Sequence, residues 1–224
     1  MTFIVFDAAK ISALDMEKIP SWIDGTIRYM LEIVSELAPK KLQGCSYKTA
    51  EGSKEDLIIF KNSSGFSSEK KNWFFPSINC AFPNKLKEYT DLNFFVTIYD
   101  VIPLLYPELW NDSFNFEFRN KLQSYVDEER MNFFCISENS KQDFCKFTGI
   151  DTTRVVVTPL AANNKTFYVC QNREEELRVR RKYSIDNSSY FFCFSSFSGR
   201  KNQILLLQAI KLFFKKFPNS DVKL

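Results

Sequence analysis

Histidine is missing from the sequence: none of the 224 residues is a histidine. This absence excludes Ser-His-Asp and Cys-His nucleophile systems, zinc sites of the HExxH type and acid–base chemistry by imidazole. Chemistry in this chain must therefore use carboxylates, Lys or Arg, hydroxyls, thiols or backbone amides. Glycine is also scarce, with six residues, so the position of each glycine is informative.

Paired cysteines are missing as well. The six cysteines form no CxxC pair, which argues against a zinc ribbon or a thioredoxin motif. Several lie inside apolar runs such as residues 133–136 and 191–194, where a thiol packs as a small hydrophobe. The chain also offers no Asp-x-Asp metal clamp. The sequence therefore contains neither of these metal-binding motifs.

Long apolar runs and a strong charge surplus are absent too. No run approaches the roughly 20 residues needed to cross a bilayer, and the first residues lack the pattern of a signal peptide. Lys and Arg number 30 against 27 Asp and Glu, a surplus too small for a phosphate-backbone binder. These features predict a cytoplasmic protein that does not bind nucleic acid. The charged run 173–182 is expected to be a solvated helix face, with contact to anionic lipid at the inner membrane surface as the alternative.

Apolar runs alternate with helical periods along the first part of the chain. Strands are expected at residues 2–6, 57–60, 93–99, 132–136 and 154–158. Helices are expected at 26–38, at 116–127, and from a capping box at Ser140 and Asp143 to about residue 147, ended by Gly149. Because the strands are nearly all apolar, this order predicts an α/β fold with a Rossmann-like parallel sheet covered on both faces.

The composition shifts after this part of the chain. A charged helix is expected at residues 172–182, then a buried strand at 190–194, a helix at 202–217 and the opening of a strand at 222–224. We therefore expect a Rossmann-like domain at residues 1–168, followed at 169–224 by a linker helix and the beginning of a second one. So few elements cannot bury that much apolar surface, and the second domain is expected to be incomplete.

Polar residues that follow the strands are the candidate site residues, because ligands of open α/β sheets bind beyond the carboxyl ends of the strands. They comprise Asp7, Tyr99-Asp100, Ser137-Glu138 and the turn at residues 195–201. Several segments, taken in order, resemble the motifs of one enzyme family. They are Asp24-Gly25-Thr26-Ile27-Arg28-Tyr29, Tyr99-Asp100-Val101-Ile102-Pro103-Leu104, Ile136-Ser137-Glu138-Asn139-Ser140-Lys141, the run from Thr148-Gly149-Ile150-Asp151 to Thr158-Pro159-Leu160-Ala161-Ala162, and Gly199-Arg200-Lys201-Asn202.

The family is that of the group 1 (family 4) retaining glycosyltransferases, which have the two-domain GT-B architecture. The resemblance implies that Arg200 and Lys201 bind the donor diphosphate at a turn that opens a helix, where amides and the helix dipole also favour an anion. A solvated basic helix cap is the alternative for these two residues. The resemblance also implies that Tyr99-Asp100 face the transferred sugar, the alternative being an acid that caps a turn.

Other motif residues are expected in the acceptor site or the cleft. Gly25 would let a ligand approach the backbone, and Arg28 would hold an anionic or hydroxylated group. The alternative is a plain helix cap with Arg28 in solvent. Ser137 and Glu138 either contact a substrate or only cap the helix that follows, and we favour capping. Many family members have His-Asp where this chain has Tyr99-Asp100, which weakens any acid–base role for Tyr99.

The main departure from the family lies at the C-terminus, where its Glu-x7-Glu motif has no counterpart. The expectation is a fragment or truncated product, or a chain whose partner supplies the rest. We predict a hexosyltransferase that moves a sugar, for example mannose from GDP-mannose, onto a surface polysaccharide or lipid-linked glycan such as lipopolysaccharide. Little or no turnover is expected from this chain alone.

Two other functions are alternatives to this prediction. A non-catalytic split subunit or remnant would bind a partner chain, or itself, through the apolar face of residues 202–217. A nicotinamide-dependent dehydrogenase is poorly supported, because no GxGxxG follows the first strand.

Overall fold

The computed structural model describes residues 4–7, 28–29, 32–33, 45–48, 57–60, 71–78, 81–88, 90, 92–164, 167–194 and 199–223. The chain divides into two compact units, Met1–Leu160 and Ala161–Leu224. The sequence prediction drew this boundary after residue 168.

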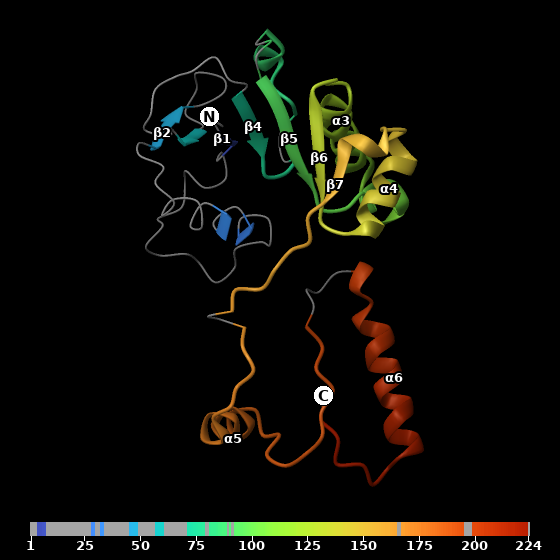
Figure 1. Cartoon of the computed structure of the whole chain (residues 1–224). Coiled ribbons are helices and arrows are strands. Elements are labelled where there is room, and N and C mark those ends of the chain that lie inside the picture. The colour runs from blue at the N-terminus through green and yellow to red at the C-terminus, as the bar shows by residue number, and fades with distance from the viewer. Residues whose placement is uncertain are drawn as a thin grey trace. The chain divides into compact units, whose positions relative to one another are not determined.

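A seven-stranded sheet with the order β2-β3-β1-β4-β5-β6-β7 forms the first unit (Figure 1). Five of its strands run parallel, in this order: β1 (Ile4–Asp7), β4 (Lys71–Phe75), β5 (Leu92–Ile98), β6 (Met131–Cys135) and β7 (Val155–Val157). The α/β class with a parallel core is confirmed, and this core is consistent with the predicted Rossmann-like sheet. The sheet is nevertheless mixed, because β3 (Leu57–Phe60) runs antiparallel to β1 and β2 (Cys45–Lys48) antiparallel to β3.

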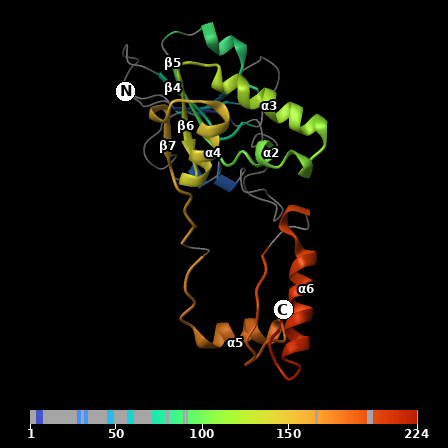
Figure 2. The ribbon, with the colours of Figure 1, turned by 90° about the vertical axis from the view of Figure 1, so that its right-hand side faces the viewer.

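Helices connect the parallel strands. Between β5 and β6 lie α2 (Ile102–Leu105), the 3-10 turn η2 (Pro107–Leu109) and α3 (Asp112–Val126). Between β6 and β7 lie α4 (Glu138–Thr148) and η3 (Thr152–Arg154), and η1 (Asn84–Glu88) precedes β5. The labelled helices α2, α3 and α4 gather beside the strands in Figure 2.

The buried core lies between these helices and one face of the sheet. Alternate residues of β5 and β6 are fully buried on this face: Phe94, Val96, Ile98, Met131, Phe133 and Cys135. Tyr125 of α3 packs edge-on against Phe75 at 5.2 Å between ring centroids, and Phe144 of α4 packs against Phe133 at 4.8 Å. Since Phe75 and Phe133 both pair with Val96 in register, α3 and α4 cover the same face.

The opposite face of the sheet carries polar and aromatic residues in alternation. The rings of Phe95 and Phe134 stack at 5.5 Å, and the Asn93 side-chain amide donates to the Asn72 side chain at 3.1 Å. Thr97 also belongs to this face and is completely buried. This face is therefore covered at the carboxyl end of β5.

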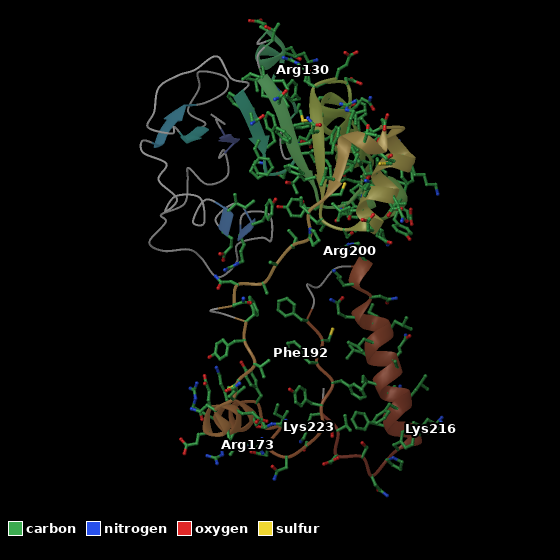
Figure 3. All side chains as sticks on the ribbon, viewed as in Figure 1. Arg130, Arg173, Phe192, Arg200, Lys216 and Lys223 are labelled. Carbon is green, nitrogen blue, oxygen red and sulfur yellow. The ribbon has the colours of Figure 1, made fainter. Side chains whose placement is uncertain are left out.

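Arg130 lies at the other end of the sheet, where β6 begins (Figure 3). Its guanidinium binds both carboxylate oxygens of Glu128 at 2.8 and 3.2 Å and lies 4.9 Å from the ring centroid of Phe94. Arg154 donates to the backbone carbonyls of Glu128 and Met131. These contacts join α3, β6 and β7 at the amino ends of the strands.

The second unit contains α5 (Arg173–Lys182), η4 (Gly199–Lys201) and α6 (Gln203–Lys216). The prediction of a buried strand at residues 190–194 is wrong: only Tyr190 forms a bridge, parallel to Lys223, and the side chain of Phe192 is 78% exposed (Figure 3). A buried strand needs neighbours on both faces, and no described residue between 161 and 223 is buried. The predicted helices and the turn after α6 are confirmed.

Candidate functional site

The strand order reverses at β1 and β4. From β1 the chain continues to β2 and β3 on one side, whereas from β4 it continues to β5 on the other. Ligands of open α/β sheets bind at such a switch point, beyond the carboxyl ends of the strands. Asp7 ends β1, Tyr99 and Asp100 follow β5, and Ser137 follows β6 closely, so the parallel strands bring these residues to one edge of the sheet.

Tyr29 closes this edge of the sheet over β5. Residues 28–29 and 32–33 are helical, as predicted, and the Tyr29 hydroxyl lies 3.3 Å from the hydroxyl of Thr97. Its ring meets the ring of Tyr99 edge-on, with 5.7 Å between the centroids. Burial raises the pKa of Tyr29, although the hydrogen bond with Thr97 acts in the opposite direction. The phenol therefore stays neutral near pH 7 and offers a hydrogen bond rather than a base.

Arg28, the predicted site residue beside Tyr29, is exposed. Tyr29 belongs to the same sequence motif, which predicted no role for it. The available signal was the largely apolar ring of Tyr29. Such a ring is buried more often than a charged side chain such as that of the neighbouring Arg28. Gly25 lies outside the described residues.

Asp100 caps the turn that follows β5. Its Oδ1 accepts a hydrogen bond from the Ile102 amide at 3.1 Å, and the residue is exposed. The structure therefore shows the alternative role predicted for Asp100, that of an acid that caps a turn. This bond fixes the direction of the carboxylate at the edge of the sheet, where it remains accessible to a ligand.

The first turn of α4 is fastened to the end of β5. Ser137 is the N-cap of α4, and its hydroxyl accepts from the Ser140 amide at 3.1 Å. The buried Ser140 hydroxyl donates to the Tyr99 carbonyl at 2.7 Å. Ser137 thus caps the helix, as we favoured, and Glu138 is exposed in the first turn.

The predicted capping box is wrong in position. The cap is Ser137 rather than Ser140, because the chain is already helical at Glu138. Ser140 instead holds the backbone of Tyr99, a positioning role that sequence reasoning missed. The spacing of three between the two serines was the available signal. Gly149 ends α4 in the left-handed conformation, with φ of 70°, as predicted.

Arg200, labelled in Figure 3, and Lys201 belong to the second unit and are both exposed. They form η4, directly before α6, so the prediction that this turn opens a helix is confirmed. Asn202 is the N-cap, with φ of 50°, and its side chain accepts from the Leu205 amide at 3.3 Å. Two cations beside the first amides of a 14-residue helix can hold an anion.

Thiol chemistry is not available in the described core. Burial raises the pKa of Cys135 to about 12 and also raises the pKa of Cys145. Among the described residues no three Cys, Asp or Glu side chains are grouped so as to hold a metal ion. No helix among the residues that the structure describes is long and apolar enough to span a bilayer. Among the described residues, the groups at this edge of the sheet are the hydroxyl of Ser137 and the carboxylates of Asp100 and Glu138.

No protein-family model, curated protein or solved structure matches this chain. Its function must therefore be argued from its motifs and from the edge of the sheet.

Proposed function

We propose that this chain is the acceptor-side half, with the start of the donor-side half, of a retaining hexosyltransferase of the GT-B type. The observation that carries the proposal is the Tyr99-Asp100 pair at the carboxyl end of β5, held by Ser140 and by the Ile102 amide. A carboxylate at this place in an α/β sheet suits a hydroxyl-rich ligand. The donor would be a nucleotide-sugar, with GDP-mannose as the first to test, and the acceptor a surface polysaccharide or lipid-linked glycan.

Each polar group has a role in this proposal. Asp100 accepts hydrogen bonds from hydroxyls of the transferred sugar, and the neutral phenol of Tyr29 lies behind Tyr99. Ser137 and Glu138, at the start of α4, border the acceptor, as do Arg28 and Gly25. Arg200 and Lys201 stabilise the negative charge of the leaving diphosphate, the main electrostatic demand of the reaction. Neither a metal nor another cofactor is needed in this scheme.

The test is a transfer assay on the product of the gene's whole reading frame, read beyond the codon for Leu224 wherever it continues. Radiolabelled GDP-mannose, UDP-glucose, UDP-galactose and UDP-N-acetylglucosamine are offered with membrane glycolipid extracts. Transfer with retention of the anomeric configuration is expected from one donor. No transfer from any of them would overturn the proposal.

A matched pair of variants localises the activity. Asp100→Asn keeps an acceptor for the Ile102 amide but removes the charge, and should lower kcat/KM about a hundredfold. Asp151→Asn is the control, since the Asp151 carboxylate also accepts from a backbone amide two residues later, that of Thr153, at 2.8 Å. The control should retain full activity, and equal losses would argue against a site at Asp100.

A non-catalytic subunit that needs a partner chain is the second candidate function. The exposed apolar side chains of the second unit favour it: Phe192 is 78%, Ile204 72% and Leu212 66% exposed. Light scattering on the purified chain should then show dimers, larger species or a complex with a second protein. A monodisperse monomer would contradict this candidate.

Peripheral binding to the inner membrane surface is a subsidiary proposal for α5. Its last turn carries Arg180, Arg181 and Lys182, which can approach anionic headgroups. Arg180 is partly engaged, because it donates to Glu176 at 2.9 Å. Salt-dependent flotation with phosphatidylglycerol vesicles is expected, and flotation that is equal with neutral vesicles would count against it.

A further inference from the structure

Helix α6 carries two apolar surfaces, of which the packing of the second unit uses only one. Ile210 and Phe213 are half-buried three residues apart, and the ring of Phe213 meets that of Phe191 edge-on, with 5.6 Å between the centroids. These residues belong to the inner face of the helix. Ile204 is 72% and Leu212 66% exposed. Their apolar surface is therefore not explained by the contacts within the unit.

Lysines lie beside these exposed apolar side chains. At about 3.6 residues per turn, the side of α6 opposite Ile210 carries three apolar residues and three lysines. We call this set the outer face of α6; all its members are exposed, and they are Ile204, Leu205, Leu212, Lys211, Lys215 and Lys216. Lys211 and Lys216 mark its two borders, and Lys215 lies within it. Apolar and cationic side chains on one exposed helix surface are typical of helices that lie in the plane of a bilayer.

The charges around the outer face restrict what can cover it. Residues 187–220 contain five Lys and Arg and no Asp or Glu. The whole second unit has twelve Lys and Arg against five Asp and Glu, whereas the first unit has 18 against 22. This segregation gives the second unit a positive potential, which attracts anionic surfaces and opposes association with a second copy of the same unit. The outer face is therefore complementary to an apolar surface that carries negative charge.

A hollow at the C-terminal end of α6 adds a place for a headgroup. It has a volume of about 560 Å³ and is lined by Phe213, Lys216, Phe217, Pro218, Asn219 and Ser220. Lys216, labelled in Figure 3, is the only charged residue of this lining, and its Nζ lies 5.5 Å from the ring centroid of Phe217. Lys216 thus belongs both to the hollow and to the outer face. An ammonium group beside apolar rings fits the phosphate of a lipid whose acyl chains lie against the helix.

We propose that the outer face of α6 binds the surface of a bilayer that contains anionic phospholipid. Its apolar side chains enter the boundary between headgroups and acyl chains, and its ammonium groups bind the phosphates. A bilayer can cover the convex side of a single helix directly, whereas a protein partner needs a complementary groove. The inference concerns the second unit alone and does not rest on the proposed transfer reaction. It adds apolar insertion to the electrostatic contact proposed for α5.

The experiment measures insertion through fluorescence quenching by brominated lipid. Leu212→Trp places a tryptophan on the outer face of the 224-residue chain. Phe116→Trp is the matched control, because Phe116 lies on α3 of the first unit and is 68% exposed, against 66% for Leu212. The vesicles contain equal parts of phosphatidylcholine and phosphatidylglycerol with brominated acyl chains. Relative to the wild type, we expect saturable additional quenching in Leu212→Trp and none in Phe116→Trp. Neutral vesicles of brominated phosphatidylcholine should require about tenfold more lipid for equal quenching.

Two charge variants separate α6 from α5. Lys211→Gln combined with Lys215→Gln should weaken binding to the anionic vesicles by roughly 25-fold, about fivefold for each lysine. Arg181→Gln combined with Lys182→Gln is the matched control on α5 and should weaken binding less, because no apolar outer face holds that helix at the bilayer. All four side chains are exposed, so both variants are expected to fold.

Several results would overturn the inference. They are the absence of additional quenching in Leu212→Trp, equal quenching by neutral vesicles, and a loss of binding from the α5 variant that equals or exceeds the loss from the α6 variant. A dimer or protein complex that persists with vesicles and prevents quenching in Leu212→Trp would overturn it as well. Insertion without sugar transfer would retain this inference and refute the enzyme, whereas transfer without insertion would do the reverse.

Discussion

The strongest stability prediction concerns Arg130→Met, which removes the charged partner of a buried carboxylate. The Glu128 side chain is 8% exposed and that of Arg130 is 29% exposed. Two hydrogen bonds join them, at 2.8 and 3.2 Å, and the Glu128 carboxylate also accepts from the Arg130 amide. Methionine preserves most of the side-chain volume, so the variant isolates the loss of charge from the loss of packing.

The expected cost is about 3 kcal/mol at pH 7, the lower end of the range for breaking a buried ion pair, because Arg130 is partly solvated. The assay is urea unfolding followed by tryptophan fluorescence, which reports the first unit because all three tryptophans lie before residue 161. Glu128→Gln combined with Arg130→Met should restore much of the lost stability, since no buried charge then lacks its partner.

The pH dependence checks the cause. Burial opposes ionisation of Glu128, but the bonds to Arg130 prevail and hold the pKa of Glu128 below its usual range. A carboxyl whose pKa is lowered in the folded state stabilises the protein above its unfolded pKa, about 4.3, and this contribution fades as the pH falls through the folded value. The difference in the free energy of unfolding between the wild type and Arg130→Met should therefore become smaller from pH 7 to pH 3. The reasoning would be refuted if this difference in unfolding free energy did not change with pH. It would also be refuted if Arg130→Met lost less than about 1 kcal/mol of stability at pH 7.

Three further predictions follow from individual contacts. Gly149→Ala should cost about 1 kcal/mol in urea unfolding, because φ is 70° and a Cβ there meets nothing within 4 Å, so only backbone strain is added. Ser140→Ala should cost about 1–2 kcal/mol by the same assay through the lost bond to the Tyr99 carbonyl, and an unchanged stability would contradict that bond's contribution. In native protein at pH 8, iodoacetamide should modify the exposed Cys170 within minutes and Cys135 only after unfolding, as read by peptide mass spectrometry.

Apolar runs and helical periods located most elements of the first unit. The predicted strand at 57–60 coincides with β3, and those at 93–99 and 132–136 are each displaced by one residue. β5 and β6 are recognisable because alternate residues of both strands are buried. The helix predicted from residue 116 begins at Asp112, because the Asn111 side chain caps it by accepting from the Phe114 amide at 2.8 Å.

The missed and mistaken strands have a common physical cause. β2 (Cys45–Lys48) and β4 (Lys71–Phe75) contain Lys, Ser or Asn among their apolar residues, and β4 is stabilised by neighbours on both sides that local sequence does not reveal. Residues 190–194 are the opposite case: they form an apolar run but no strand. An apolar run forms a strand only where neighbouring strands pair with it. The antiparallel direction of β3 also depends on pairing across the sheet and not on its own residues.

The candidate site was predictable in its location but not in its hydrogen bonds. Parallel strands place their carboxyl ends together, so a sequence that marks the strands also marks Tyr99, Asp100 and Ser137. Which group each hydroxyl binds depends on residues far apart in the chain, as with Ser140 and Tyr99, or Tyr29 and Thr97. No local pattern contains those pairs.

Thr97 shows how the fold and the candidate site are connected. It is a polar residue that is fully buried next to the last residue of β5, where an unsatisfied hydroxyl would cost about 1–3 kcal/mol. Its partner is the Tyr29 hydroxyl, and Tyr29 also supports the ring of Tyr99. The same bond thus satisfies the core and holds a helix against the carboxyl end of β5. A ligand bound at Asp100 would meet a surface that is fixed from both faces of the sheet, by Tyr29 on one face and by Ser140 of α4 on the other. A site that positions a hydroxyl-rich substrate requires such preorganised support.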